Sequence, residues 1–166
     1  MGINFILFAL GCQQLNRSSI EIKKIDKAWL DSIIKKSDTS WVKTYRNNEF
    51  TSAEYFIDKK DSIVTQLMKD VNKNIRQVII AKYDQVKLFF SEYYANGQLK
   101  ANYALDSLGM YNGACKQYYE DGRIKSEGIY KHGFLSANWK NYDKKGVLRS
   151  TDVYDEHGQL IRTDKN

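Results

Sequence analysis

Two histidines and two acidic pairs are the side chains of this sequence that could take part in acid–base chemistry. His132 and His157 each directly precede a glycine, which is typical of a turn. The pairs Glu120-Asp121 and Asp155-Glu156 also fall in polar turn segments, where carboxylates are normally solvated. No HExxH, CxxC, GxSxG, Walker or GxGxxG pattern is present. The sequence therefore predicts a protein without catalytic residues, metal site or cofactor.

Cys12 has a different context, because it follows Gly11 and a mainly apolar run over residues 3–10. Such a run is too short to span a bilayer but has the length of the apolar region of a signal peptide. The stretch Ala9-Leu10-Gly11-Cys12 resembles a bacterial lipobox. This resemblance implies a lipoprotein-type signal over residues 1–12, lipid attachment at Cys12, and a place in the bacterial cell envelope, on the periplasmic side or the cell surface. The alternative is an apolar N-terminal strand with a buried cysteine, in a cytoplasmic protein.

Tyrosine is abundant, with 12 residues in a chain of 166. Adjacent pairs occur at Tyr93-Tyr94 and Tyr118-Tyr119, and strand alternation puts the two members of each pair on opposite faces. Exposed aromatic rows on a sheet make good protein-binding surfaces, although plain packing explains such residues equally well. The candidate partner-binding residues are Tyr94, Tyr119, Tyr130, Trp139 and Tyr142.

These tyrosines belong to a repeat. No glycine lies between Gly11 and Gly97, and eight occur from Gly97 to Gly158. The segments 113–125 and 137–149 are 24 residues apart and share a small first residue, a lysine, a tyrosine, a turn glycine and a branched apolar residue. A similar segment starts at Tyr93, and a last one closes the array half a period later. Such spacing predicts β-hairpins that bury their apolar faces by stacking side by side.

The glycines mark the hairpin ends. We expect turns at Asn96-Gly97, Asp121-Gly122, Lys145-Gly146 and His157-Gly158, where glycine adopts a positive φ without a steric clash. Cys115 aligns with Trp139 in the repeat, and this position is of the inward type. We therefore interpret Cys115 as a small core residue and not as a nucleophile.

The pattern Tyr-Tyr-x-x-Gly-x-Leu-Lys, followed by Gly-x-Tyr-x-x-Gly, resembles the MORN-variant repeat over Tyr93 to Leu160. It is also similar to proteins built from that repeat and labelled YwqK-type antitoxins of toxin–antitoxin systems. The resemblance implies an elongated sheet of hairpins and a protein that binds and neutralises a partner toxin. Ser136-Ala137 departs from the glycine expected before Trp139.

Upstream of the repeat, apolar residues follow a helical period from Ile22 to Ile34, and Ser18 and Glu21 have the spacing of a capping box. A helix is therefore predicted over residues 19–36. We expect its apolar face to pack on the sheet, with a helix lying on a membrane as the alternative. Alternating apolar residues and polar turns predict antiparallel strands from residue 51 to 92.

The net charge of +6 is spread evenly, with an excess of three basic residues in both 12–60 and 61–166. This diffuse charge argues against a nucleic-acid-binding surface. The predicted organisation is a signal at 1–12, linker and helix at 13–50, N-terminal β-hairpins at 51–92 and MORN-variant repeats at 93–166. The predicted fold is mainly β, an elongated single-layer meander with one N-terminal helix.

The predicted function is non-catalytic protein binding, in its most specific form that of an antitoxin or immunity-type protein, with membrane attachment through Cys12. The alternative is a structural envelope lipoprotein that binds glycan or lipid headgroups.

Overall fold

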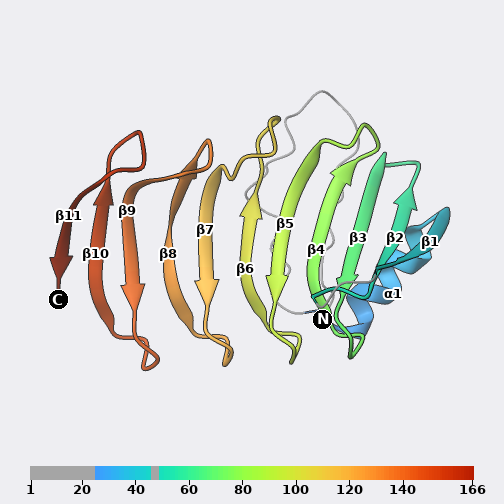
Figure 1. Ribbon diagram of the computed structural model, residues 1–166, viewed down its shortest axis with the longest axis horizontal. Helices are drawn as coiled ribbons and strands as arrows, with labels where there is room; N and C mark the ends of the chain where they lie inside the picture. The colour runs from blue at the N-terminus through green and yellow to red at the C-terminus, as the bar shows by residue number, and fades with distance from the viewer. Residues whose placement is uncertain (1–24, 46–48) are drawn as a thin grey trace, which may run out of the picture.

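A computed structural model describes residues 25–45 and 49–166 of the chain. Eleven antiparallel strands form one open sheet in which each strand pairs with its neighbours in sequence (Figure 1). The predicted single-layer meander with one N-terminal helix is thus confirmed. The elements are α1(Lys27–Lys36), β1(Thr39–Thr44), β2(Ser52–Asp58), β3(Ile63–Lys69), β4(Ile75–Lys82), β5(Lys87–Tyr93), β6(Leu99–Ala104), β7(Gly113–Tyr118), β8(Ile124–Lys131), β9(Phe134–Tyr142), β10(Leu148–Tyr154) and β11(Leu160–Lys165).

Helix α1 begins later than its sequence pattern predicts. Asp26 has an extended backbone, and its side chain accepts a hydrogen bond from the Trp29 amide, so Asp26 is the N-cap. The prediction of a continuous helix over 19–36 is therefore wrong, because the N-cap Asp26 is not helical and the helix begins at Lys27. The predicted capping residues Ser18 and Glu21 lie outside the described residues. No helix among the described residues is long and apolar enough to cross a membrane.

One turn geometry recurs along the sheet. The amide of its first residue donates to the carbonyl of its fifth, and the amide of its fourth donates back to the carbonyl of the first. The fourth residue always has a positive φ, which favours glycine. The turns of this type span residues 70–74, 82–86, 94–98, 106–110, 119–123, 143–147 and 155–159. The predicted turn glycines at 97, 122, 146 and 158 all occupy the fourth position.

The turns show that the repeating unit is one strand and one turn. The fourth-position residues Lys73, Gln85, Gly97 and Gly109 follow one another at intervals of twelve residues. The period of 24 in the sequence therefore corresponds to two strands, with successive turns at opposite ends of the sheet. The unit begins upstream of Tyr93, and the sheet continues without a break from β5 into β6.

The two faces of the sheet carry separate apolar clusters. Paired residues on neighbouring strands share a face, whereas consecutive residues of a strand lie on opposite faces. Val78 pairs with Ser91, and its neighbour Ile79 pairs with Phe90, which in turn pairs with Tyr103. Val78 and Tyr103 therefore lie on opposite faces.

We call the face of Val78 the helix face, because α1 packs against it. There Ile25, Trp29 and Leu30 contact a cluster of buried residues formed by Leu67, Val78, Tyr93 and Leu99. We call the opposite face the open face. It carries the second cluster, whose buried members are Ala101, Tyr103, Cys115 and Trp139. The predicted packing of the helix on the sheet agrees with these contacts.

Ala137 has an unusual backbone conformation for a residue with a side chain, with a φ of 56°. It follows Gly113 by 24 residues in the repeat, and Gly113 also has a positive φ, of 110°. An L-residue in this region is strained relative to glycine. Ala137 is thus the position where the repeat lacks the glycine that its backbone favours.

We predict that Ala137→Gly raises the free energy of unfolding by about 1 kcal/mol, because glycine removes the Cβ strain. Urea denaturation followed by circular dichroism measures the change. Ala104→Gly in β6 is the matched control, and we expect it to destabilise the protein by about 0.5–1 kcal/mol, since no positive φ compensates for the added chain entropy. A midpoint for Ala137→Gly at or below that of the wild type would contradict the strain argument.

Candidate functional site

The structure places the five predicted binding residues in different surroundings. Tyr94 and Tyr119 each occupy the first position of a turn, at the same end of the sheet. The Tyr94 hydroxyl donates to the carbonyl of Tyr118 over 2.8 Å, and the Tyr119 hydroxyl donates to the carbonyl of Tyr142 over 2.8 Å. Each hydroxyl therefore ties one hairpin to the next. Both side chains are half-buried, and their observed contacts are structural.

Tyr142 lies on the helix face near the middle of the repeat region. Its hydroxyl donates to Oε1 of Glu127 over 2.8 Å, and this hydrogen bond raises the pKa of the phenol. The second carboxylate oxygen of Glu127 is 3.6 Å from the ammonium of Lys116. Tyr142 thus orients a carboxylate and is separated by the sheet from Tyr130 and Trp139.

Tyr130 and Trp139 meet on the open face in an aromatic cluster, which we define as Phe90, Tyr103, Tyr111, Tyr130 and Trp139. The rings of Tyr103 and Tyr111 are stacked with centroids 4.2 Å apart, and Phe90 stacks on Tyr103 at 5.9 Å. Tyr130 meets Tyr111 and Trp139 edge to face, at 5.3 and 5.1 Å. The cluster therefore crosses the sheet from β5 to β9. Aromatic pairs of this geometry stabilise packing beyond their buried area.

Trp139 contributes to packing and is not an accessible contact. Its indole is only 4% exposed, and its Nε1 donates to the carbonyl of Ile129 over 3.1 Å. The indole lies over Gly128, where an added Cβ would come within 2.4–2.7 Å of the ring. Trp139 was predicted as a candidate partner-binding residue at an inward-type position, and it is buried here because the missing side chain of Gly128 leaves room for the indole against the sheet.

The tyrosine hydroxyls of the cluster remain available. Within the described residues, Tyr103, Tyr111 and Tyr130 donate no hydrogen bond from their hydroxyls, and no buried side-chain oxygen or nitrogen lacks a partner. These hydroxyls therefore reach solvent. Burial raises the pKa of Tyr130 to about 12 and also raises the pKa values of Tyr103 and Tyr111. The three groups are thus neutral hydrogen-bonding groups at physiological pH.

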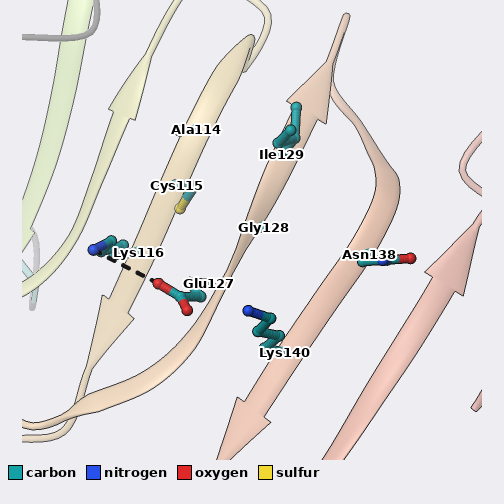
Figure 2. A pocket seen from close by; sticks show the side chains of 8 residues that line it. All are labelled: Ala114, Cys115, Lys116, Glu127, Gly128, Ile129, Asn138 and Lys140. Atoms are coloured by element: carbon teal, nitrogen blue, oxygen red, sulfur yellow. Dashed lines mark ion pairs between the residues drawn. The ribbon is translucent and has the colours of Figure 1, made fainter. Parts of the chain in front are cut away.

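A hollow lies behind the cluster on the helix face, across β7, β8 and β9 (Figure 2). Lys116 pairs in register with Glu127, and Glu127 pairs with Lys140. Figure 2 shows the Lys116–Glu127 ion pair on one side and Lys140 on β9 across from it. The hollow is beyond the part of this face that contacts α1.

Both histidines lie in turns, as their sequence positions predict. Nδ1 of His132 is 2.9 Å from Oδ2 of Asp106, and this hydrogen bond holds the pKa of the Asp106 carboxyl below its ordinary value. The contact ties the β8–β9 turn to the segment that carries Tyr111. Nε2 of His157 is 3.6 Å from Glu156, and both side chains are exposed. No group of three His, Cys, Asp or Glu side chains in residues 25–45 and 49–166 could hold a metal ion.

Sequence reasoning missed three members of the cluster. Phe90 was assigned only to a strand, Tyr103 falls between two copies of the repeat, and Tyr111 lies in the connection before β7. Cross-strand register brings Phe90 opposite Tyr103, and this register was not visible in the sequence. Cys12, the predicted lipid attachment site, lies outside the described residues.

Comparison with known families finds a MORN repeat variant at residues 111–132. The match begins at Tyr111, continues through β7 and the following turn, and ends at His132 after β8. Repeats of this family commonly bind proteins or lipids. No curated protein matches the chain.

The close contact of Gly128 with Trp139 leads to a prediction. Gly128→Ala should lower the free energy of unfolding by about 1–3 kcal/mol and change the intrinsic fluorescence, because the new methyl group displaces the indole. Gly146→Ala is the control, since no atom lies within 4 Å of its added Cβ and only its positive φ is strained. Equal fluorescence spectra for wild type and Gly128→Ala would show that Trp139 does not occupy this position.

A second prediction concerns Cys115. Burial raises the pKa of its thiol from 9.0 to about 12, and the residue is 3% exposed. Because folding favours the neutral thiol, this stabilisation is complete below pH 9 and is lost as the pH rises from 9 to 12. The free energy of unfolding should therefore fall across that range, and Cys115→Ala should reduce the slope.

The same burial predicts slow alkylation. At pH 8, iodoacetamide should modify Cys115 at least about a hundredfold more slowly in the native protein than in urea, because reaction requires opening of the structure. Mass spectrometry of the peptide that contains Cys115 gives both rates. Comparable rates in the two conditions would place the thiol at the surface.

Proposed function

We propose that this MORN-repeat protein is a non-catalytic binding protein that holds a protein partner through the aromatic cluster on its open face. The most specific form of the proposal is an antitoxin or immunity-type protein that neutralises a partner toxin. The observation that carries the proposal is the set of solvent-reaching hydroxyls on Tyr103, Tyr111 and Tyr130, which lie on a face that α1 leaves uncovered.

The chemistry of the cluster suits a protein surface. Tyrosine combines a rigid apolar ring with one polar group, and such residues are enriched where interfaces contribute most binding energy. The rings support one another by stacking and edge contacts, so little side-chain entropy is lost when a partner binds. The His132–Asp106 contact and the turn hydrogen bonds hold the strands that carry them.

A tether at the cell envelope is a further part of this proposal. Lipid attachment at Cys12 would place the sheet next to a bilayer and favour partners that cross or reach the envelope. Mass spectrometry of the protein isolated from membranes tests this part, because acylation adds a defined mass to the peptide that starts at Cys12. Recovery of an unprocessed N-terminus from the cytoplasm would exclude it.

The binding proposal predicts a loss of affinity when the hydroxyls are removed. A partner is identified by pull-down and mass spectrometry, and its purified form is titrated against wild type and a Tyr111→Phe/Tyr130→Phe double variant. We expect roughly tenfold weaker binding by the double variant, since each lost hydrogen bond contributes about 0.5–1.5 kcal/mol. Both substitutions of the double variant keep the aromatic rings and therefore the packing of the cluster.

Tyr83→Phe is the matched control, because Tyr83 is 56% exposed and lies outside the cluster. Equal affinity of wild type and double variant would exclude the cluster as the binding surface, and recovery of only lipid or glycan would exclude a protein partner. Co-expression of a captured toxin with each variant then tests neutralisation, because growth should be restored by wild type more fully than by the double variant.

A further inference from the structure

The hollow on the helix face lies at a bulge in β9. Glu127 pairs with Lys140, and Ile129 pairs with Ser136, so three residues of β9 lie opposite Gly128 alone. Ala137 in this bulge has a φ of 56°, and the indole of Trp139 points to the open face. Bulges inside a sheet commonly re-aim side chains at functional sites. The strained backbone and the hollow therefore occur at the same place.

The hollow has the size of one side chain. Its volume is about 240 Å³, and it is lined by Ala114, Cys115, Lys116, Glu127, Gly128, Ile129, Asn138 and Lys140 (Figure 2). An engineered apolar cavity of about 150 Å³ holds benzene. The hollow is larger but open to solvent, so it can take a leucine or an aromatic side chain that stays partly exposed. Ile129 is 48% exposed at its border, which leaves apolar surface uncovered beside the charged groups.

The charges around the hollow are not balanced. The two oxygens of Glu127 are engaged by the hydroxyl of Tyr142 at 2.8 Å and by the ammonium of Lys116 at 3.6 Å. Lys140 makes no ion pair with any residue in the part of the chain that the structure describes. An apolar hollow with one uncommitted ammonium group complements a ligand that carries an apolar side chain next to a carboxylate.

The same face already holds an amphipathic segment elsewhere. Helix α1 places Trp29 and Leu30 against the cluster of Leu67, Val78, Tyr93 and Leu99. Large apolar side chains therefore pack on this face where the chain itself supplies them. Over β7–β9 no described element supplies such a side chain.

We infer that the hollow over β7–β9 binds an acidic segment of a protein partner, with one large apolar side chain in the hollow and a neighbouring carboxylate paired with Lys140. This surface lies on the opposite side of the sheet from the aromatic cluster. The inference therefore goes beyond the proposed function and does not require it to hold.

Nuclear magnetic resonance titration of the full chain with capped tripeptides tests the inference. The probe is acetyl-Glu-Leu-Glu-amide, compared with acetyl-Gln-Leu-Gln-amide and acetyl-Glu-Ala-Glu-amide. We expect the first peptide alone to shift the backbone amides of residues 114–116, 127–129 and 138–140. Equal shifts with all three peptides, shifts elsewhere, or no shift would overturn the inference.

Two variants and a control complete the test. Lys140→Glu should weaken binding of the acidic peptide at least about fivefold by reversing the charge, and Ala114→Leu should abolish it by filling the hollow from an exposed position. Lys87→Glu makes the same charge change at an exposed site in β5 and should bind like wild type. The Tyr111→Phe/Tyr130→Phe double variant should also bind the peptide normally. Unchanged binding by both Lys140→Glu and Ala114→Leu would refute the assignment of the site.

Discussion

The pair of backbone hydrogen bonds that closes each five-residue turn determines the architecture of this sheet. It reverses the chain in a fixed number of residues, so β4, β5, β6, β8, β10 and β11 each begin two residues after the fourth residue of the turn. Asp70, Asp106, Asp143 and Asp155 reinforce it by accepting amide hydrogen bonds within their own turns. Because each turn sets the register of the next strand, residues of the same face line up on successive strands.

A single layer has to build its core on both of its faces. Among the residues that the structure describes, α1 covers part of the helix face, and the aromatic rings of the open face pack on one another. Tyrosine suits this arrangement because its ring packs while its hydroxyl reaches water or a neighbouring carbonyl. The hydroxyls of Tyr94 and Tyr119 thus link neighbouring hairpins by hydrogen bonds to backbone carbonyls. The hydroxyl of Tyr142 binds Glu127, whereas those of Tyr111 and Tyr130 reach solvent.

The sequence was informative where side-chain type follows directly from backbone geometry. Glycine at 97, 122, 146 and 158 predicted the hairpins, and alternation predicted β2 to β5 closely. Polar residues also predicted the turns at 70–74 and 82–85, but not that these have the geometry of the glycine turns, because Lys73 and Gln85 adopt a positive φ without being glycine. Strand β1 lies in the stretch predicted as linker and helix, since its six residues are all exposed and carry no alternating pattern.

The candidate site was harder to predict than the fold. The position of Cys115 beside Trp139 followed from the repeat, but the burial of Trp139 depends on Gly128 of another strand. The aromatic cluster depends on cross-strand register, and the hollow depends on a bulge that places three residues opposite one. Contacts between residues distant in sequence decided each of these features, and the order of residues along one strand does not encode them.

The hydrogen bonds from tyrosine hydroxyls to the next hairpin also constrain how a protein of this kind can change length in evolution. Tyr94 and Tyr119 reach carbonyl groups 24 and 23 residues further along the chain, at the same end of the sheet. Duplication of one strand and its turn would move the following turn to the other end and leave the hydroxyl without its acceptor. Duplication of two units leaves the following turns at the same end of the sheet as before. Genes for such sheets are therefore expected to lengthen or shorten in steps of two strands.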